Sequence, residues 1–288
     1  MAHPRFSFEV FPAKTSEGET RLDAALGPLS ALEPDFISVT YGAGGSVRDR
    51  TIGLIRSLAG RGGVPVAGHI TCVGASRTEI DSVLRDYWKA GVRRIVALRG
   101  DSLDGIGEAY APHPEGYAFA SDLIPGARAI ADFDISVGCY PEAHPEARGL
   151  PHEIENLKRK FDAGADRAIS QFFFEPEIFL RFRDAVADAG AKQPVVPGLM
   201  LQPNFKGLSR MASLCGAFIP GHLQRKYEGL DDDRPARVAV TADIVTSICE
   251  RLLSQGVDAF HFYTMNSAGL AAQVCRNLGF ADKQELAS

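Results

Sequence analysis

The sequence has few of the features that mark disulfide-bonded, metal-binding or membrane proteins. Its five cysteines are odd in number, widely spaced and without a C-x-x-C pair, which favours free thiols in a reducing compartment over a disulfide framework or a zinc site. The seven histidines do not cluster at metal-ligand spacing, so we expect no metal ion. No apolar run approaches the ~20 residues that cross a bilayer, and the N-terminal residues lack the apolar segment of a signal peptide.

An excess of positive charge is also missing. The net charge of -5 argues against a general nucleic-acid or membrane-surface binder, because both classes favour basic faces. A hydrophobic content of 45% and a charged content of 23% are ordinary for a globular protein, and 288 residues can bury a large core. We therefore expect a cytoplasmic enzyme that acts on a small molecule.

Strand and helix patterns alternate along the whole chain, with no linker or break in composition. Residues 95–98 are apolar throughout and stop abruptly at Arg99-Gly100-Asp101, which is typical of a strand that is buried on both faces. Eight such repeats at this length predict an α/β fold, a single (β/α)8 TIM barrel that occupies residues 1–288 as one domain. A two-domain Rossmann protein is the alternative. The strands are expected at residues 6–11, 35–41, 65–72, 92–98, 134–140, 167–174, 195–200 and 258–264.

Polar and aromatic residues gather at the carboxyl ends of these strands, where barrels place their ligand sites. Their convergence fits a pocket for a planar cofactor. A glycine-rich turn at residues 42–45 precedes a helix and suits an anion, but it matches neither a Walker loop nor the dinucleotide fingerprint. The strand-end residues are Glu9, Thr40, Tyr41, His69, Arg99, Asp101, Tyr140, Gln171, Met200 and Tyr263.

Three of the candidate features have two readings each. Glu9 lies among Phe8, Val10 and Phe11, and aromatic walls would suit its carboxyl group to donate a proton; alternatively it is a strand-end glutamate in a salt bridge. His69 is either a ligand contact or a core histidine that bonds to the backbone. The basic run at residues 158–160 either faces solvent or reaches a phosphate.

Taken in order, eight stretches of the chain resemble the methylenetetrahydrofolate reductase family, and the likeness covers nearly the whole sequence. Each stretch alone is a weak signal, whereas their order and spacing are specific. The resemblance implies a flavoprotein of one-carbon metabolism and methionine biosynthesis that holds FAD noncovalently across the top of the barrel. It would interconvert 5,10-methylenetetrahydrofolate and 5-methyltetrahydrofolate by hydride transfer, with NADH or NADPH as the electron donor. The stretches are residues 6–12, 38–45, 69–72, 97–101, 140–145, 158–160, 169–174 and 261–266.

The resemblance also implies roles for individual residues. Glu9 would be the general acid that protonates N10 of the folate, Asp101 a carboxylate beside flavin and pterin, and Gln171 a hydrogen-bond partner of the pterin. Arg159 and Lys160 would neutralise the FAD pyrophosphate. The implied FAD contacts are Thr40, Tyr41, Ala43, His69, Arg99, Gly100, Asp101, Ala120, Tyr140, His144, Ala147, Glu153, Asn156, Arg159 and Lys160.

Departures from the family pattern lie in the region that would hold folate or nicotinamide. Gly207 stands where bacterial relatives can have a glutamine, Met211 where some have a phenylalanine, and Ser267 where an arginine is expected. These losses leave open NADH, NADPH or another donor and the physiological direction of the reaction. Arg225, Lys226 or Arg276 would be alternative sources of the missing charge.

Two further readings remain open. The chain could be a flavin- or folate-binding relative with little activity unless a partner protein is present, although a binding module has no need of a proton donor such as Glu9. An unrelated barrel lyase would need a Schiff-base lysine or a metal at a strand end, and neither is found. Bacterial relatives form homo-oligomers, but the sequence does not give a subunit number. Because the chain stops at Ser288, we do not expect the C-terminal regulatory domain of eukaryotic relatives.

Overall fold

The sheet of this protein closes into a barrel. The computed structural model describes residues 4–41, 45–102 and 109–280. Within them nine strands, all parallel, follow the order β7-β6-β5-β4-β3-β2-β1-β9-β8. The two ends of this order meet, because β7 and β8 are consecutive pieces of one stretch of chain. The strands are β1 (Arg5–Val10), β2 (Ile37–Val39), β3 (Val66–Thr71), β4 (Arg94–Leu98), β5 (Asp134–Cys139), β6 (Arg167–Ser170), β7 (Val195–Val196), β8 (Gly198–Met200) and β9 (Ala259–Tyr263).

The seventh strand expected from the sequence is divided at Pro197. Its first piece, β7, pairs with β6, and its second piece, β8, pairs with β9. Pro197 has no N–H to donate to a neighbouring strand, but its carbonyl accepts a hydrogen bond from the His261 N–H at 2.9 Å. The (β/α)8 barrel predicted from the sequence is therefore confirmed, with one strand interrupted by a proline.

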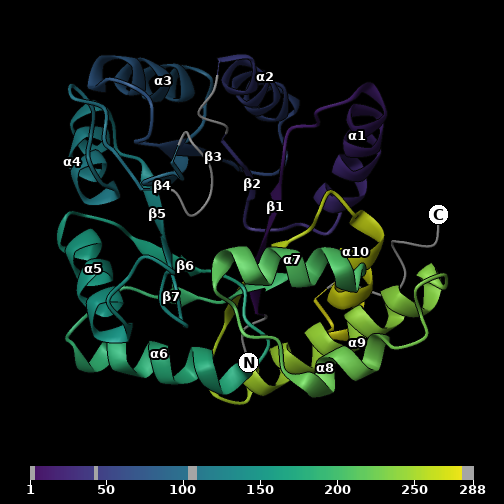
Figure 1. Ribbon diagram of the computed structural model, residues 1–288. Helices are drawn as coiled ribbons and strands as arrows, with labels where there is room; N and C mark the ends of the chain where they lie inside the picture. Colours follow the sequence, from purple (N-terminus) through teal and green to yellow (C-terminus); the bar gives the residue numbers. More distant parts are fainter. Residues whose placement is uncertain (1–3, 42–44, 103–108, 281–288) are drawn as a thin grey trace.

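Helices surround the strands, and α7 crosses the view in front of them (Figure 1). The start of α3 illustrates the local signals: the Ser76 hydroxyl accepts from the Glu79 N–H, and the Glu79 carboxylate accepts from the Ser76 N–H, which is a capping box. The helices are α1 (Ser16–Ser30), α2 (Gly45–Arg61), α3 (Arg77–Lys89), α4 (Ala120–Ile130), α5 (Leu150–Asp162), α6 (Pro176–Asp188), α7 (Phe205–Cys215), α8 (Gly221–Tyr227), α9 (Arg234–Leu253) and α10 (Ala268–Asn277).

Alternation along each strand sorts residues between the helices and the barrel interior. On β1, Phe6, Phe8 and Val10 belong to the main hydrophobic core that the helices cover. Ser7 and Glu9 face the interior, where both approach His261 of β9. Inward-facing residues at the carboxyl ends of the strands are therefore the ones that can reach a ligand.

A second hydrophobic cluster attaches α7 and α8 to the carboxyl ends of β6 and β8. Leu208 of α7 and Tyr227 of α8 pack there with Phe172, Phe174 and Met200. The two helices thus form one wall of the barrel mouth, at the end where the sequence places the ligand.

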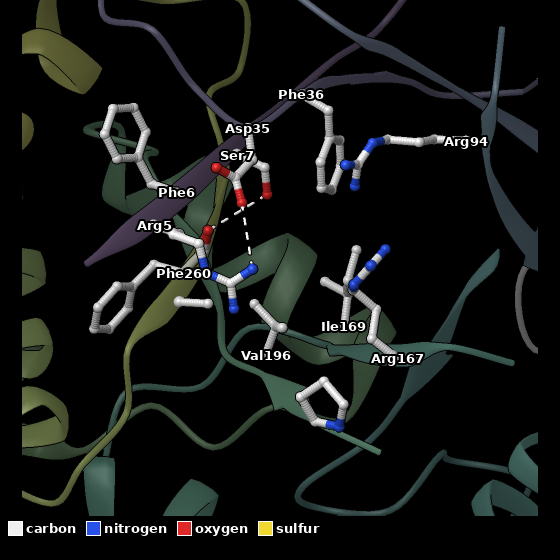
Figure 2. A pocket seen from close by; sticks show the side chains of 12 residues that line it. Arg5, Phe6, Ser7, Asp35, Phe36, Arg94, Arg167, Ile169, Val196 and Phe260 are labelled. Carbon is white, nitrogen blue, oxygen red and sulfur yellow. Dashed lines mark hydrogen bonds and ion pairs between the residues drawn. The ribbon is translucent and has the colours of Figure 1, made fainter. Parts of the chain in front are cut away.

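Ion pairs close the opposite end of the barrel. The Asp134 carboxylate is shared by Arg94, at 2.9 Å, and by Arg167, which contacts both of its oxygens. Arg5 lies 3.8 Å from Asp35. Arg5, Asp35, Arg94 and Arg167 line a small cavity at the starts of the strands (Figure 2). Because the amino-terminal end of a barrel serves stability rather than chemistry, we place the candidate site at the other end.

The cysteines fit the expectation of free thiols. All five are unpaired, and Cys72, Cys139, Cys249 and Cys275 are buried. Burial raises the pKa of the Cys72 thiol to about 12, so this group stays protonated at neutral pH. In the described part of the chain, no three or more His, Cys, Asp or Glu residues gather in a way that would hold a metal ion. None of the described helices combines the length and apolar character needed to span a membrane.

Candidate active site at the barrel mouth

Glu9 lies near the end of β1 and faces two histidines in the barrel interior. Its Oε2 atom is 3.3 Å from His69 Nε2 on β3 and 3.8 Å from His261 Nε2 on β9. Both histidines are buried, whereas 19% of the Glu9 side chain is exposed. The carboxyl group is thus flanked by imidazoles yet remains accessible, which is the geometry required to exchange a proton with a ligand.

The walls around Glu9 differ from those expected from the sequence. Phe8 and Val10 are fully buried in the outer core, and Phe11 is 38% exposed. Adjacent strand residues point to opposite faces, so the immediate neighbours of Glu9 cannot surround it. The predicted aromatic wall is wrong. His69 and His261 lie there instead, and Tyr263 is paired with Glu9 across β1 and β9.

Sequence reasoning missed two hydrogen bonds that position Glu9 and its neighbour His261. Ser7 Oγ lies 2.7 Å from His261 Nδ1, and both residues are buried. The Thr264 hydroxyl donates to the Glu9 carbonyl at 2.7 Å, which joins the ends of β1 and β9. The available signal was the two-residue period, because Ser7 precedes Glu9 by two positions and must share its face.

The buried His69 predicts that stability depends on pH. Burial lowers its pKa; Glu9 partly opposes this effect, and His261 adds to it. The unfolded chain therefore takes up a proton near pH 6.5 that the folded chain does not, so the free energy of unfolding should fall as the pH drops below that value. Urea unfolding of the apoprotein at pH 7.5 and 5.5 checks this. The loss should shrink in His69→Gln but not in His222→Gln, which replaces an exposed histidine; equal losses in both variants would contradict it.

A second group of predicted residues lies at the ends of β4 and β5. Arg99 Nε donates to the Gly100 carbonyl at 3.1 Å, and its guanidinium lies 4.5 Å from the centre of the Tyr110 ring. Gly100 has a φ of +85°, and a Cβ there would lie 2.5 Å from Val73, so only glycine fits this turn. The turn leaves Asp101 exposed at the barrel mouth.

Tyr140 and His144 complete this group. Their rings meet edge to face, with centroids 4.7 Å apart. Burial raises the pKa of the Tyr140 hydroxyl and the Asp101 carboxylate adds to the rise, while burial and Arg99 lower the pKa of His144. At neutral pH, Asp101 therefore faces a neutral phenol and a neutral imidazole.

Gln171 follows β6 directly. Its side-chain oxygen accepts the Phe172 N–H at 3.0 Å, which fixes the amide and leaves its nitrogen as a donor for a ligand. No contact between Gln171 and Glu9 or Asp101 is found within the described residues. A ligand that uses all three must therefore span the mouth.

Helix α5 carries the feature that best fits a cofactor. Glu153 is 2% exposed, and its Oε1 atom has no hydrogen-bond partner among the described residues. Burying an acceptor without a hydrogen bond costs free energy, so a ligand that brings a donor to this atom would be favoured. Lys160 Nζ donates to the Gly138 carbonyl at 2.8 Å, and burial lowers its pKa while Glu153 opposes the shift. A buried acceptor without a hydrogen-bond partner, close to the partly buried Lys160, suits a nucleotide, whose ribose supplies hydroxyl donors and whose phosphates supply negative charge.

The three basic residues 158–160 of α5 point in different directions and contact different partners. Lys158 donates to the Ala189 carbonyl at 3.0 Å, away from Lys160. Arg159 is exposed and contacts Glu155 at 3.2 Å and Asn156 at 3.5 Å. The run therefore divides, with Lys160 directed inward and Lys158 fixed to the neighbouring helix.

The remaining predicted cofactor residues lie in the segments that follow β2, β4 and β5 at the barrel mouth, which we call the rim. The Thr40 carbonyl accepts from Thr51 at 3.2 Å, and Tyr41 packs against the main core. Ala120 is the buried first residue of α4, and the Ala147 N–H donates to the His144 carbonyl at 2.8 Å. Ala43 and most of the glycine-rich turn lie outside the described residues.

The departures from the family pattern also have defined places. Met211 packs against the second hydrophobic cluster, and the side chain of Gln202 lies over Gly207, 3.6 Å from the position a Cβ would take. The Ser267 N–H donates to the Thr264 carbonyl at 2.9 Å just before α10. Arg225 and Lys226 are exposed on α8.

The sequence comparisons with known proteins agree on one family. A family model described as methylenetetrahydrofolate reductase matches residues 1–279. The 5,10-methylenetetrahydrofolate reductase of Escherichia coli is 45% identical over 273 residues, covering 95% of this chain and 90% of that protein. A probable methylenetetrahydrofolate reductase (NADH) of Oryza sativa is 34% identical over 98% of this chain and 49% of its own length. A Clostridium thermocellum protein that binds two copies of 5-methyl-5,6,7,8-tetrahydrofolic acid has the same fold, with a TM-score of 0.66 at 14% identity over 96% of both chains.

Proposed function

Because the chain belongs to the methylenetetrahydrofolate reductase family, a family of oxidoreductases, we propose that it interconverts 5,10-methylenetetrahydrofolate and 5-methyltetrahydrofolate with noncovalently bound FAD. When bound, FAD would supply the hydride exchange with the one-carbon unit of the folate. The observation that carries the proposal is the partly exposed Glu9 carboxyl, which the barrel holds between His69 and His261 at its mouth.

Glu9 would act as the general acid. Donating its proton to N10 of the folate opens the five-membered ring and leaves a cationic iminium at the one-carbon unit. The Ser7–His261 pair and the Thr264 hydrogen bond support this role. The first orients the His261 ring, whose Nε2 lies 3.8 Å from the Glu9 carboxylate, and the second fixes the Glu9 backbone carbonyl. A proton donor must be positioned in this way to act on a bound substrate.

Asp101 and Gln171 would bind and orient the folate. The exposed Asp101 carboxylate can stabilise the positive charge that develops on the substrate. The Gln171 amide, whose oxygen is held by the Phe172 N–H, can offer its N–H donors to the pterin. Gln171 follows β6 directly and Asp101 follows the tight Gly100 turn after β4, which limits the motion of both side chains and favours a fixed geometry.

The FAD site would run from the β3 and β4 ends to α5. Glu153 would accept the ribose hydroxyls through its orphaned oxygen, and Lys160 with Arg159 would neutralise the pyrophosphate. Arg99, Tyr140 and His144 would line the part of the site between the β4 end and α5. The same rim would include Thr40, Tyr41, Ala43, His69, Gly100, Asp101, Ala120, Ala147 and Asn156.

A flavin- or folate-binding relative that needs another donor or a partner protein is the second candidate. Gly207, Met211 and Ser267 favour it, because an aromatic ring and an arginine that would hold folate or nicotinamide are missing there. Glu9 favours the enzyme. Anaerobic titration of the oxidised protein with NADH and with NADPH separates these cases and identifies the donor.

The proposal is tested by an anaerobic visible spectrum, recorded before and after addition of 5-methyltetrahydrofolate. We expect a bound flavin whose absorption bleaches as it accepts electrons from the folate. A bound flavin that does not bleach would favour the second candidate. The absence of any flavin signal after addition of FAD would contradict the cofactor assignment.

A further inference from the structure

An ion pair joins two parts of the proposed cofactor rim that are far apart in the sequence. Arg99 follows β4, and Glu146 lies in the loop between β5 and α5. Their contact is two-pronged: Nη1 lies 2.6 Å from Oε2, and Nη2 lies 3.1 Å from Oε1. Parallel hydrogen bonds of this kind are the strongest geometry available to an arginine and a carboxylate.

Arg99 has two further contacts besides the ion pair. Its Nε donates to the Gly100 carbonyl, and its guanidinium lies over the Tyr110 ring. Only 23% of the Arg99 side chain is exposed, against 39% for Glu146. The hydrogen bonds raise the pKa of Arg99 and lower that of Glu146, so both groups stay charged at neutral pH. Exposed pairs contribute little when both side chains are mobile, but here one partner is already immobile.

Glu146 also organises its own loop. Its N–H donates to His144 Nδ1 at 3.1 Å, and the His144 ring rests edge-on against Tyr140. The next residue, Ala147, donates its N–H to the His144 carbonyl. Three residues proposed to contact FAD, namely Arg99, His144 and Ala147, therefore adjoin Glu146 directly, and Tyr140 is joined to it through the His144 ring. Glu146 is not itself among the proposed contacts.

We propose that Glu146 is a positioning residue that fastens the β5–α5 loop to the end of β4 and thereby slows the release of FAD. This inference rests on the proposed function, because it assigns a role within the same cofactor site. On this proposal FAD leaves when the β5–α5 loop moves away from the end of β4. Breaking the two-pronged pair frees the loop, while Arg99 keeps its contacts to the Gly100 carbonyl and the Tyr110 ring.

Glu146→Gln tests the proposal, since it keeps the shape and removes the charge. FAD-loaded protein is diluted, and the appearance of free FAD fluorescence gives the release rate. We expect release to be about fivefold faster in the variant at low salt, in line with the loss of a well-ordered ion pair. Added salt should accelerate release from the wild type more than from the variant, so that the ratio of the two release rates falls toward one.

The matched control is Glu177→Gln, which breaks the 2.8 Å pair between Glu177 and Arg251 on α6 and α9, away from the rim. Its release rate should equal that of the wild type. A second variant, Glu146→Ala, together with the melting temperature of each apoprotein, separates faster release from general unfolding. Equal release rates for the wild type and Glu146→Gln, in a wild type that retains FAD, would overturn this inference alone. A wild type that takes up no FAD would overturn the proposed function as well.

Discussion

Replacing Glu9 by glutamine is expected to reduce turnover of 5,10-methylenetetrahydrofolate by about a thousandfold. Glutamine has nearly the same size and can occupy the same place beside His69 and His261, but its amide cannot deliver a proton to N10 of the folate. General acids contribute roughly 10²- to 10⁴-fold to the reactions they assist. Stopped-flow reoxidation of the reduced flavin by 5,10-methylenetetrahydrofolate measures this step, because N10 must be protonated before the iminium can accept hydride.

Binding of the cofactor should survive the same change. Glu9 lies in the barrel interior near the end of β1, whereas the residues proposed to hold the FAD phosphates and ribose lie on α5. We therefore expect Glu9→Gln to retain its flavin spectrum and to be reduced by its electron donor at a normal rate. Glu19→Gln, which alters an exposed residue of α1, provides the control. Normal folate turnover in Glu9→Gln would remove Glu9 as the proton donor.

The barrel itself could be predicted because local patterns repeat along the chain. Each apolar strand is followed by a helical pattern, and eight such units at this length leave few alternatives. The division of the seventh strand was less visible. Pro197 could be read as a weak position in a strand, but β7 and β8 each hold their places by pairing with a different neighbour, and pairing depends on closure of the whole sheet.

The site could be predicted only in part, for a related reason. Strand ends identify Glu9, Asp101 and Gln171 as candidates because each follows or closes an apolar run. The partners of these residues come from distant parts of the chain: His261 meets Glu9 only because β1 pairs with β9, and Glu146 meets Arg99 across 47 residues. Nearest neighbours in the sequence, such as Phe8, were the wrong guide, since they face the opposite side of the wall.

The largest effect on stability is expected for Gly198→Ala, at the seam where the barrel closes. A Cβ on Gly198 would lie 2.1 Å from the Ser170 carbonyl oxygen and 2.7 Å from the ring and the hydroxyl of Tyr263. The backbone carbonyl cannot move freely, because it already accepts the Tyr263 hydroxyl at 2.7 Å, and the Gly198 N–H is bonded to the Ser170 hydroxyl at 2.9 Å. A methyl group must therefore push β6 and β8 apart.

Overpacking of this kind costs about 3 kcal/mol at the upper end of its usual range, so the melting temperature of the variant should fall by roughly 5–10 °C. Differential scanning calorimetry of the apoprotein measures the shift. Gly53→Ala serves as the matched control: Gly53 is an exposed residue within α2 that has open space where its Cβ would lie, and alanine there should stabilise the helix by about 0.5–1 kcal/mol. Both substitutions add one methyl group. A lower melting temperature for Gly198→Ala and a higher one for Gly53→Ala would show that the destabilisation comes from crowding between β6 and β8. An unchanged melting temperature in Gly198→Ala would mean that β6 and β8 can separate at no cost, which is incompatible with the hydrogen bonds that join them.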